Sequence, residues 1–210
     1  MKLKKKIVSL AVVVAMLAIA ASGTLAYFTD AVVAHNVIEM AKVDITLVEQ
    51  TKDADGNLVA WPTDGVSNVV PGVSVDKIVS VTNADDSGPA WIRVYVEWSI
   101  KDANGKAMKG LFDDGFPMLT FGGLNDTAWT LGEGGYWYYN EPLATGESTE
   151  VLFDSVNFDP KMGNEYQNCT ATIDVVAQAV QQKNNPVPEG GDVTQVAGWP
   201  ASPLRPAPET

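Results

Sequence analysis

The stretch AWIRVYVEWSI, residues 90–100, decides the fold class of this 210-residue chain. Every second residue from Ala90 to Ile100 is apolar, and a mixed, wettable set stands between them. A period of two is the pattern of a β-strand with one buried face and one exposed face. The sequence therefore predicts a half-buried strand here.

The same pattern returns in CTATIDVVAQA, residues 169–179, where Cys169, Ile173 and Val175 share the apolar face. Weaker alternation marks residues 43–47, 75–81 and 151–158, and only a short turn near residues 38–41 resembles a helix. Turn-forming sequences, Asp53–Asn57 and Asp102–Lys106, stand where hairpins need them. We therefore expect an all-β domain, an antiparallel jelly-roll-like β-sandwich.

Working outward to the N-terminus, residues 1–6 hold four lysines, and residues 7–21 form an almost unbroken apolar run. This is the layout of a secretory signal peptide, and the run is short for a membrane span. Thr24 and Ala26 place small side chains at the positions that a signal peptidase inspects, so residues 1–26 are expected to be removed and Tyr27 to become the first residue. The alternative is an uncleaved membrane anchor.

Charge limits the classes of partner. The formal charge of the whole chain is −12, and removing the four N-terminal lysines takes it to about −16. Such a surface repels nucleic acid and anionic membranes. No second apolar run of membrane length follows. We expect a secreted or cell-surface protein without stable membrane insertion after cleavage.

The domain is expected to cover residues 27–180. From residue 181 the composition turns to Asn, Pro, Gly and Glu, with five prolines between Pro186 and Pro206. Proline interrupts strand pairing, so residues 181–210 are predicted to form a flexible tail. Val193–Trp199 is the one stretch apolar enough to dock onto the domain.

Catalytic residue types are scarce. His35 is the single histidine, which excludes a zinc site with two or three histidines and leaves a Ser-His-Asp triad dependent on a residue near the mature N-terminus. Cys169 is the single cysteine, and its place on an apolar strand face favours an inert, buried thiol. The sequence predicts no enzyme activity, no catalytic residues and no cofactor.

Acidic residues leave weak calcium binding open without specifying ligands. Asp53–Asn57 resembles part of a calcium loop but lacks the downstream glutamate and the flanking helices of an EF-hand, which favours a hairpin turn. Asp113, Asp114 and Asp126 form a second acidic group near a glycine-rich stretch. No metal site is predicted from either.

Four consecutive aromatic residues, Tyr136–Tyr139, are the most distinctive side-chain group. In a strand, Trp137 and Tyr139 face one way and Tyr136 and Tyr138 the other. One pair is expected to fill the core. Tyr136 and Tyr138 would then be exposed, where they stack on sugar or on a neighbouring chain, unless the aromatics instead seal the end of the sandwich.

The junction GTLAYFTD, residues 23–30, resembles the site processed by the dedicated signal peptidase SipW in the TasA/camelysin family of secreted biofilm-matrix proteins. Looser similarity extends over most of residues 20–181 and includes VTN at 81–83, WIRV at 91–94, GEST at 146–149 and ATIDVVAQAVQ at 171–181. The junction is the specific part of this resemblance.

The resemblance implies a jelly-roll subunit of extracellular fibres in the biofilm matrix of a Gram-positive bacterium. In such fibres an N-terminal segment freed by cleavage completes the sheet of the next subunit. Camelysin has also been described as a cell-surface metalloprotease, but this chain has no zinc motif, so that activity is not carried over.

Residues 27–37 would supply such a donor strand through Phe28, Val32, Val33 and Val37. A free arm with these side chains is too apolar to remain solvated, and addition to an open sheet edge would bury them. The alternative is an arm that folds back onto its own sandwich. For the whole protein three classes stay open: a self-assembling fibre subunit, a cell-surface or glycan-binding adhesin, and a secreted metalloprotease.

Overall fold

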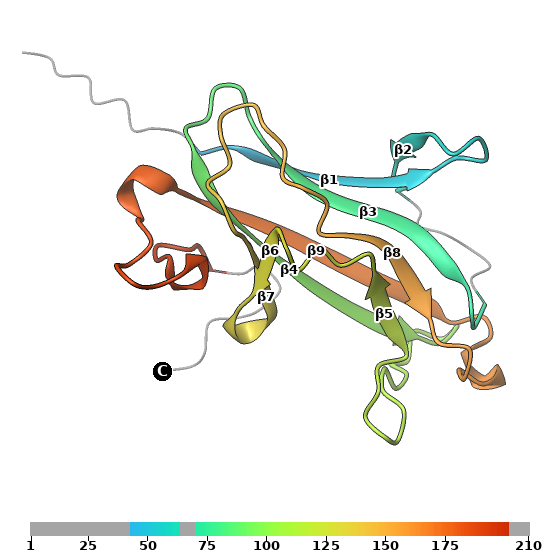
Figure 1. Cartoon of the computed structure of the whole chain (residues 1–210). Helices are drawn as coiled ribbons and strands as arrows, with labels where there is room; N and C mark the ends of the chain where they lie inside the picture. The colour runs from blue at the N-terminus through green and yellow to red at the C-terminus, as the bar shows by residue number, and fades with distance from the viewer. Residues whose placement is uncertain (1–42, 64–69, 202–210) are drawn as a thin grey trace, which may run out of the picture. The chain divides into compact units, whose positions relative to one another are not determined.

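The computed structural model describes residues 43–63 and 70–201, and the predictions for residues 1–42 and 202–210 concern residues outside these ranges. The described part is all-β and consists of two antiparallel sheets (Figure 1). One sheet has the strand order β2-β1-β3-β8-β5, and the other has the order β6-β7-β4-β9. No helix within the described ranges is long and apolar enough to cross a membrane.

The five-stranded sheet contains β1 (Ile45–Lys52), β2 (Leu58–Ala60), β3 (Ser74–Asn83), β5 (Leu119–Gly122) and β8 (Phe153–Phe158). The four-stranded sheet contains β4 (Ala90–Lys101), β6 (Trp129–Leu131), β7 (Tyr136–Tyr139) and β9 (Thr170–Gln181). The described residues also contain four short 3-10 helices: η1 (Glu133–Gly135), η2 (Asn164–Tyr166), η3 (Gln182–Asn184) and η4 (Val193–Gln195).

The strands expected from the period-two pattern are confirmed. The stretches at 43–47, 75–81, 90–100, 151–158 and 169–179 correspond to β1, β3, β4, β8 and β9. β4 and β9 pair without a register shift over twelve residues, from Ala90 opposite Gln181 to Lys101 opposite Thr170. Figure 1 shows them as two long strands side by side, and they are the longest strands of the four-stranded sheet.

The core lies between the two sheets. Val79 and Phe153 from one sheet meet Ile92, Val94 and Trp129 from the other, and all five side chains are at most 1% exposed. Branched and aromatic side chains suit a pleated surface packed on one face. Burying one such side chain contributes about 1.5–3 kcal/mol, so this core supplies most of the stability of a chain that has no disulfide.

Asn83, at the end of β3, ties the loops at one end of the sandwich together. Its side chain is fully buried, and Nδ2 lies within hydrogen-bond distance of the carbonyl oxygens of Gly88 (3.1 Å), Leu143 (3.2 Å) and Ala144 (3.2 Å). These carbonyls belong to the loop before β4 and to the loop between β7 and β8. The amide therefore fixes the spacing of two connections that pass between the sheets.

The two acidic turns are hairpin turns, as the sequence predicts. In the first, Asp53 Oδ1 accepts hydrogen bonds from the backbone N–H groups of Asp55 (2.9 Å) and Asn57 (2.8 Å), and Gly56 has a φ of 85°. Asp102 makes the corresponding bonds to Asn104 and Lys106. In both turns a carboxylate replaces missing backbone partners, and the glycine adopts a conformation that other residues avoid.

The prediction of a flexible tail is wrong for residues 182–201. Val193 and Val196 are 6% and 4% exposed and pack on the outer face of the four-stranded sheet, together with Trp199. The prolines prevent strand pairing, but they leave an apolar stretch free to bury itself on aromatic side chains that the sandwich would otherwise expose. The sequence had singled out Val193–Trp199 as the stretch able to dock, and this part of the prediction is confirmed.

Candidate assembly site

β9 presents a long edge. It pairs with β4 along its whole length, and no other strand of the described residues pairs with its second side. In an antiparallel pair, every second residue turns its N–H and C=O away from the partner strand. β9 therefore offers a row of backbone donors and acceptors twelve residues long.

The features that natural proteins use to block such edges are scarce in β9. Its residues, TATIDVVAQAVQ, include no proline and no lysine, and its register has no bulge. Asp174 is the single charge, and it stands directly opposite Glu97 of β4, where like charges repel. A long, flat edge of this kind is a template for pairing with another strand.

β1 presents a second open edge on the opposite sheet. β3 pairs with β1 from Ile45 to Gln50, whereas β2 pairs only with Gln50–Lys52 on the other side. The first half of β1 thus has no strand on its outer side within residues 43–63 and 70–201. β1 also contacts β9, so the two open edges lie on the same side of the sandwich.

Between these two edges runs an apolar seam, made of half-buried side chains that face the core. From β9 it contains Ala171, Ile173, Val175, Ala177 and Ala179, and from the β1 side Val43, Ile45 and Leu47. The inward residues Ile92 and Val94 of the neighbouring β4 are 0% exposed. The sheets are therefore closed over β4 and incompletely closed over the seam.

The open edges and the seam suit the same kind of ligand. An extended segment beside β9 or β1 would pair with the outward-facing backbone groups of these edges, and its alternate side chains would cover the seam. The pattern required of it is apolar at every second position. Backbone pairing and apolar burial are the two interactions that this arrangement offers.

Tyr136 and Tyr138 lie outside the core as predicted, but the expectation that both are exposed is wrong. Tyr138 is 5% exposed and packs with Trp91, Val180, Val193 and Val196, and Tyr136 is half-buried beside them. Their partners in the alternation, Trp137 and Tyr139, pack against the core. The covering segment comes from the far end of the sequence, which alternation within one strand does not reveal.

Arg93 organises this outer face. Its guanidinium carbon lies 3.9 Å from the ring centroid of Tyr136 and 4.6 Å from that of Trp199. Nε donates to Gln178 Oε1 at 2.8 Å, and Nη2 donates to the carbonyl oxygen of Pro200 at 3.3 Å. Cation–π contacts of a partly buried arginine each contribute about 1 kcal/mol.

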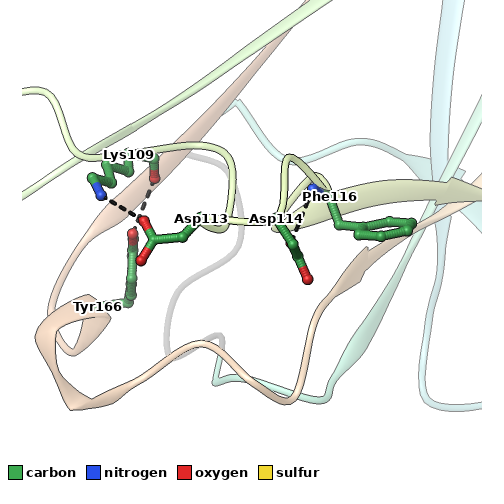
Figure 2. A network of polar contacts seen from close by, with 5 residues as sticks. All are labelled: Lys109, Asp113, Asp114, Phe116 and Tyr166. Atoms are coloured by element: carbon green, nitrogen blue, oxygen red, sulfur yellow. Dashed lines mark hydrogen bonds and ion pairs between the residues drawn. The ribbon is translucent and has the colours of Figure 1, made fainter.

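Polar contacts among its own residues and with Tyr166 hold the acidic loop before β5 (Figure 2). Lys109 Nζ lies 2.9 Å from Asp113 Oδ1, and Asp114 Oδ1 accepts a hydrogen bond from the N–H of Phe116. The neighbouring ammonium lowers the pKa of Asp113, and both side chains are exposed. The Tyr166 hydroxyl donates to the carbonyl oxygen of Lys109 at 3.1 Å.

The structure also places Cys169 and the second acidic group of the sequence. Cys169 lies half-buried in a small cluster with Met118, Met162 and Tyr166, and burial raises the pKa of its thiol. Residues 43–63 and 70–201 contain no group of three or more His, Cys, Asp or Glu side chains placed to hold a metal ion. Asp113, Asp114 and Asp126 are thus not gathered into such a group.

The predicted processing residues Thr24, Ala26 and Tyr27 lie outside the described residues, as does His35. So do the donor-strand residues Phe28, Val32, Val33 and Val37. The seam was missed at the sequence level. Alternation identified the apolar face of β9, but the position of a strand at a sheet edge depends on pairing between distant residues.

Comparison of the chain with protein-family models, with curated proteins and with solved structures finds no match in any of the three.

Proposed function

We propose that this protein is a secreted structural subunit of extracellular fibres or biofilm matrix, with a jelly-roll-like sandwich that assembles by strand donation. The observation that carries the proposal is the pair of open edges on β9 and β1 with the apolar seam between them. The resemblance of residues 23–30 to a SipW-processed TasA/camelysin junction supports the same role.

In the proposed assembly, cleavage after Ala26 frees Tyr27–Val37 as an arm. The arm of one subunit adds to the open β9 edge of the next, and its apolar side chains cover the seam. Because donor and acceptor surfaces differ, the contact is head-to-tail and repeats into a filament rather than closing into a dimer. Partners are copies of this chain or related subunits.

An arm that folds back onto its own seam is the competing arrangement. It would satisfy the same edge, and it would yield a closed monomer. The adhesin alternative gains nothing from Tyr136 and Tyr138, since the C-terminal segment covers them. We propose a non-enzymatic role on the same grounds as the sequence analysis, namely a single histidine and no paired catalytic motif.

Binding of the arm as a separate peptide tests the proposal. A mature chain that lacks residues 27–37 is titrated with a peptide of the sequence YFTDAVVAHNV, and binding is followed by calorimetry. Strand donation predicts saturable binding at one site per chain. A matched peptide with Val32→Asp and Val33→Asp should bind at least about tenfold more weakly, since it carries charges where the seam needs apolar groups.

Absence of binding by the unaltered peptide, to a chain shown by circular dichroism to be folded, would contradict the proposal. Equal binding of the two peptides would show that the seam does not select its ligand and would contradict it as well.

A further inference from the structure

The outer face of the four-stranded sheet already holds a ligand, the C-terminal segment of its own chain. We call Trp91, Arg93, Tyr136, Tyr138, Gln178 and Val180 the tail-binding face, and Val193–Ala201 the tail segment. Val193 and Val196 are buried on this face, and Trp199 lies with its ring centroid 5.7 Å from that of Tyr138, edge to face.

Polar contacts fix the tail segment in register. Gln178 Nε2 donates to the carbonyl oxygens of Pro200 (3.2 Å) and Ala201 (3.1 Å), and Arg93 Nη2 also reaches the Pro200 oxygen. These hydrogen bonds are all accepted by the backbone carbonyl oxygens of Pro200 and Ala201. The ring of Trp199 packs against Arg93 and Tyr138. The face therefore contacts this part of the segment through the ring of Trp199 and the carbonyl oxygens of Pro200 and Ala201.

The tail segment also carries its own internal structure. Asp192 accepts hydrogen bonds from the N–H and hydroxyl of Thr194, and Trp199 Nε1 donates to the carbonyl oxygen of Val196 at 2.7 Å. These bonds stay within residues 192–199. They are contacts that the segment makes with itself, in addition to those that it makes with the face.

A hinge joins the tail segment to the sandwich. All five residues from Pro188 to Asp192 are exposed, and Gly190 has a φ of 74°. Opening the hinge therefore removes no buried contact of its own. Fully extended, five residues span about 17 Å, which limits the tail to a neighbour whose sheet lies close by.

We propose that the tail segment exchanges between copies, so that the tail of one chain occupies the tail-binding face of another. All contacts made within one chain are equally available between two identical chains, which is the condition for exchange of a structural element. In dilute protein the tether favours its own face, and at the local concentrations of an assembly the neighbour's face competes.

This exchange takes place on the outer face of the sheet and does not use strand pairing at the β9 edge. It would therefore add lateral links between subunits of the proposed filaments.

Two complementary variants of the full mature chain test the exchange. Trp199→Ala weakens the tail and leaves the face vacant. Arg93→Ala weakens the face and leaves the tail intact but without a site in its own chain. Tagged Trp199→Ala protein is immobilised, and capture of untagged Arg93→Ala protein is measured and compared with capture of each variant by itself.

Exchange predicts that the complementary pair is captured at least about tenfold more than either self-combination. Glu97→Ala, on the same strand and the same face but outside the tail contacts, replaces Arg93→Ala in the matched control and should lose this excess. If Arg93→Ala fails to fold, Tyr136→Ala takes its place.

Equal capture in all combinations would overturn the proposal, because association through the β9 edge or any other surface does not distinguish the variants. Absence of capture in every combination would overturn it too.

Discussion

At the scale of single residues, exposure separates two kinds of apolar side chain that the sequence pattern treats alike. Val94 on β4 is fully buried, whereas Ile173 on β9 faces the same core from the half-open seam. The hydrophobic contribution of a side chain scales with the area removed from water. The two positions should therefore respond differently to the same substitution.

Val94→Asp should unfold the domain, since it places an unpaired charge in the closed core at a cost of about 3–5 kcal/mol. Ile173→Asp leaves its carboxylate partly hydrated and should cost only about 1–2 kcal/mol in the monomer, while abolishing assembly. Thr172→Asp, on the exposed face of the same strand, should do neither. Urea unfolding monitored by circular dichroism gives the three values. Equal losses for Val94→Asp and Ile173→Asp would contradict the half-open seam.

Asn83 offers a second test at the residue scale. Asn83→Asp would remove a donor that lies among three backbone carbonyls and put negative charge beside them. We expect a loss of about 2–4 kcal/mol in the free energy of unfolding. Asn104→Asp, in the exposed hairpin turn, is the matched control and should change stability little. Thermal melts of the two variants make the comparison. Similar melting temperatures would contradict a stabilising role for the hydrogen bonds of Asn83.

At the scale of elements, sequence reasoning succeeded where a structure is local. Alternation located β4 and β9, and acidic Asx turns marked the hairpins, because both signals arise within a few neighbouring residues. Two features could not be predicted from the sequence, because they depend on contacts between residues far apart in the chain. One is the open edge of β9, and the other is the burial of Tyr138 by Val193 and Val196, more than fifty residues later. Proline-rich composition correctly predicted the absence of strands in residues 182–201, but composition does not report docking.

Docking of the tail should depend on pH. Hydrogen bonds from the hydroxyl and then the N–H of Thr194 lower the pKa of Asp192 in the folded state. A lowered carboxyl pKa contributes stability above its ordinary value near 4, and that contribution disappears as the pH falls through the lowered value. We therefore expect acidification below about pH 4 to weaken docking of the tail segment, because protonation of Asp192 removes the acceptor that orders the turn at Val193–Gln195.

Tryptophan fluorescence of the mature chain, recorded from pH 7 to pH 2, follows the weakening of docking through the exposure of Trp199 and Trp91. Asp192→Asn keeps an oxygen that accepts from Thr194 and removes the titration, so its curve should lack the transition assigned to the tail. Superimposable curves for the two proteins would show that Asp192 does not govern docking.

At the scale of the whole molecule, the proposed function requires that export and cleavage come before assembly. The lysines and the apolar run of residues 1–21, followed by Thr24 and Ala26, predict cleavage after Ala26. N-terminal sequencing of protein recovered from the culture medium should begin at Tyr27. Protein that begins at Met1 and stays in the membrane fraction would contradict export and leave the arm without a free end.

The central claim joins the free arm to the open edge. Strand donation and an arm folded back on its own seam both cover the same side chains, so stability alone does not separate them. They differ in what they build. Donation is head-to-tail and propagates, whereas a folded-back arm leaves each chain closed.

Negative-stain electron microscopy of the purified mature protein, beside the same chain without residues 27–37, tests this claim most directly. We predict filaments of the mature protein and folded, separate particles of the truncated one. Mature protein that stays folded but forms no filaments over a range of concentration, pH and ionic strength, or truncated protein that forms filaments equally well, would contradict the account.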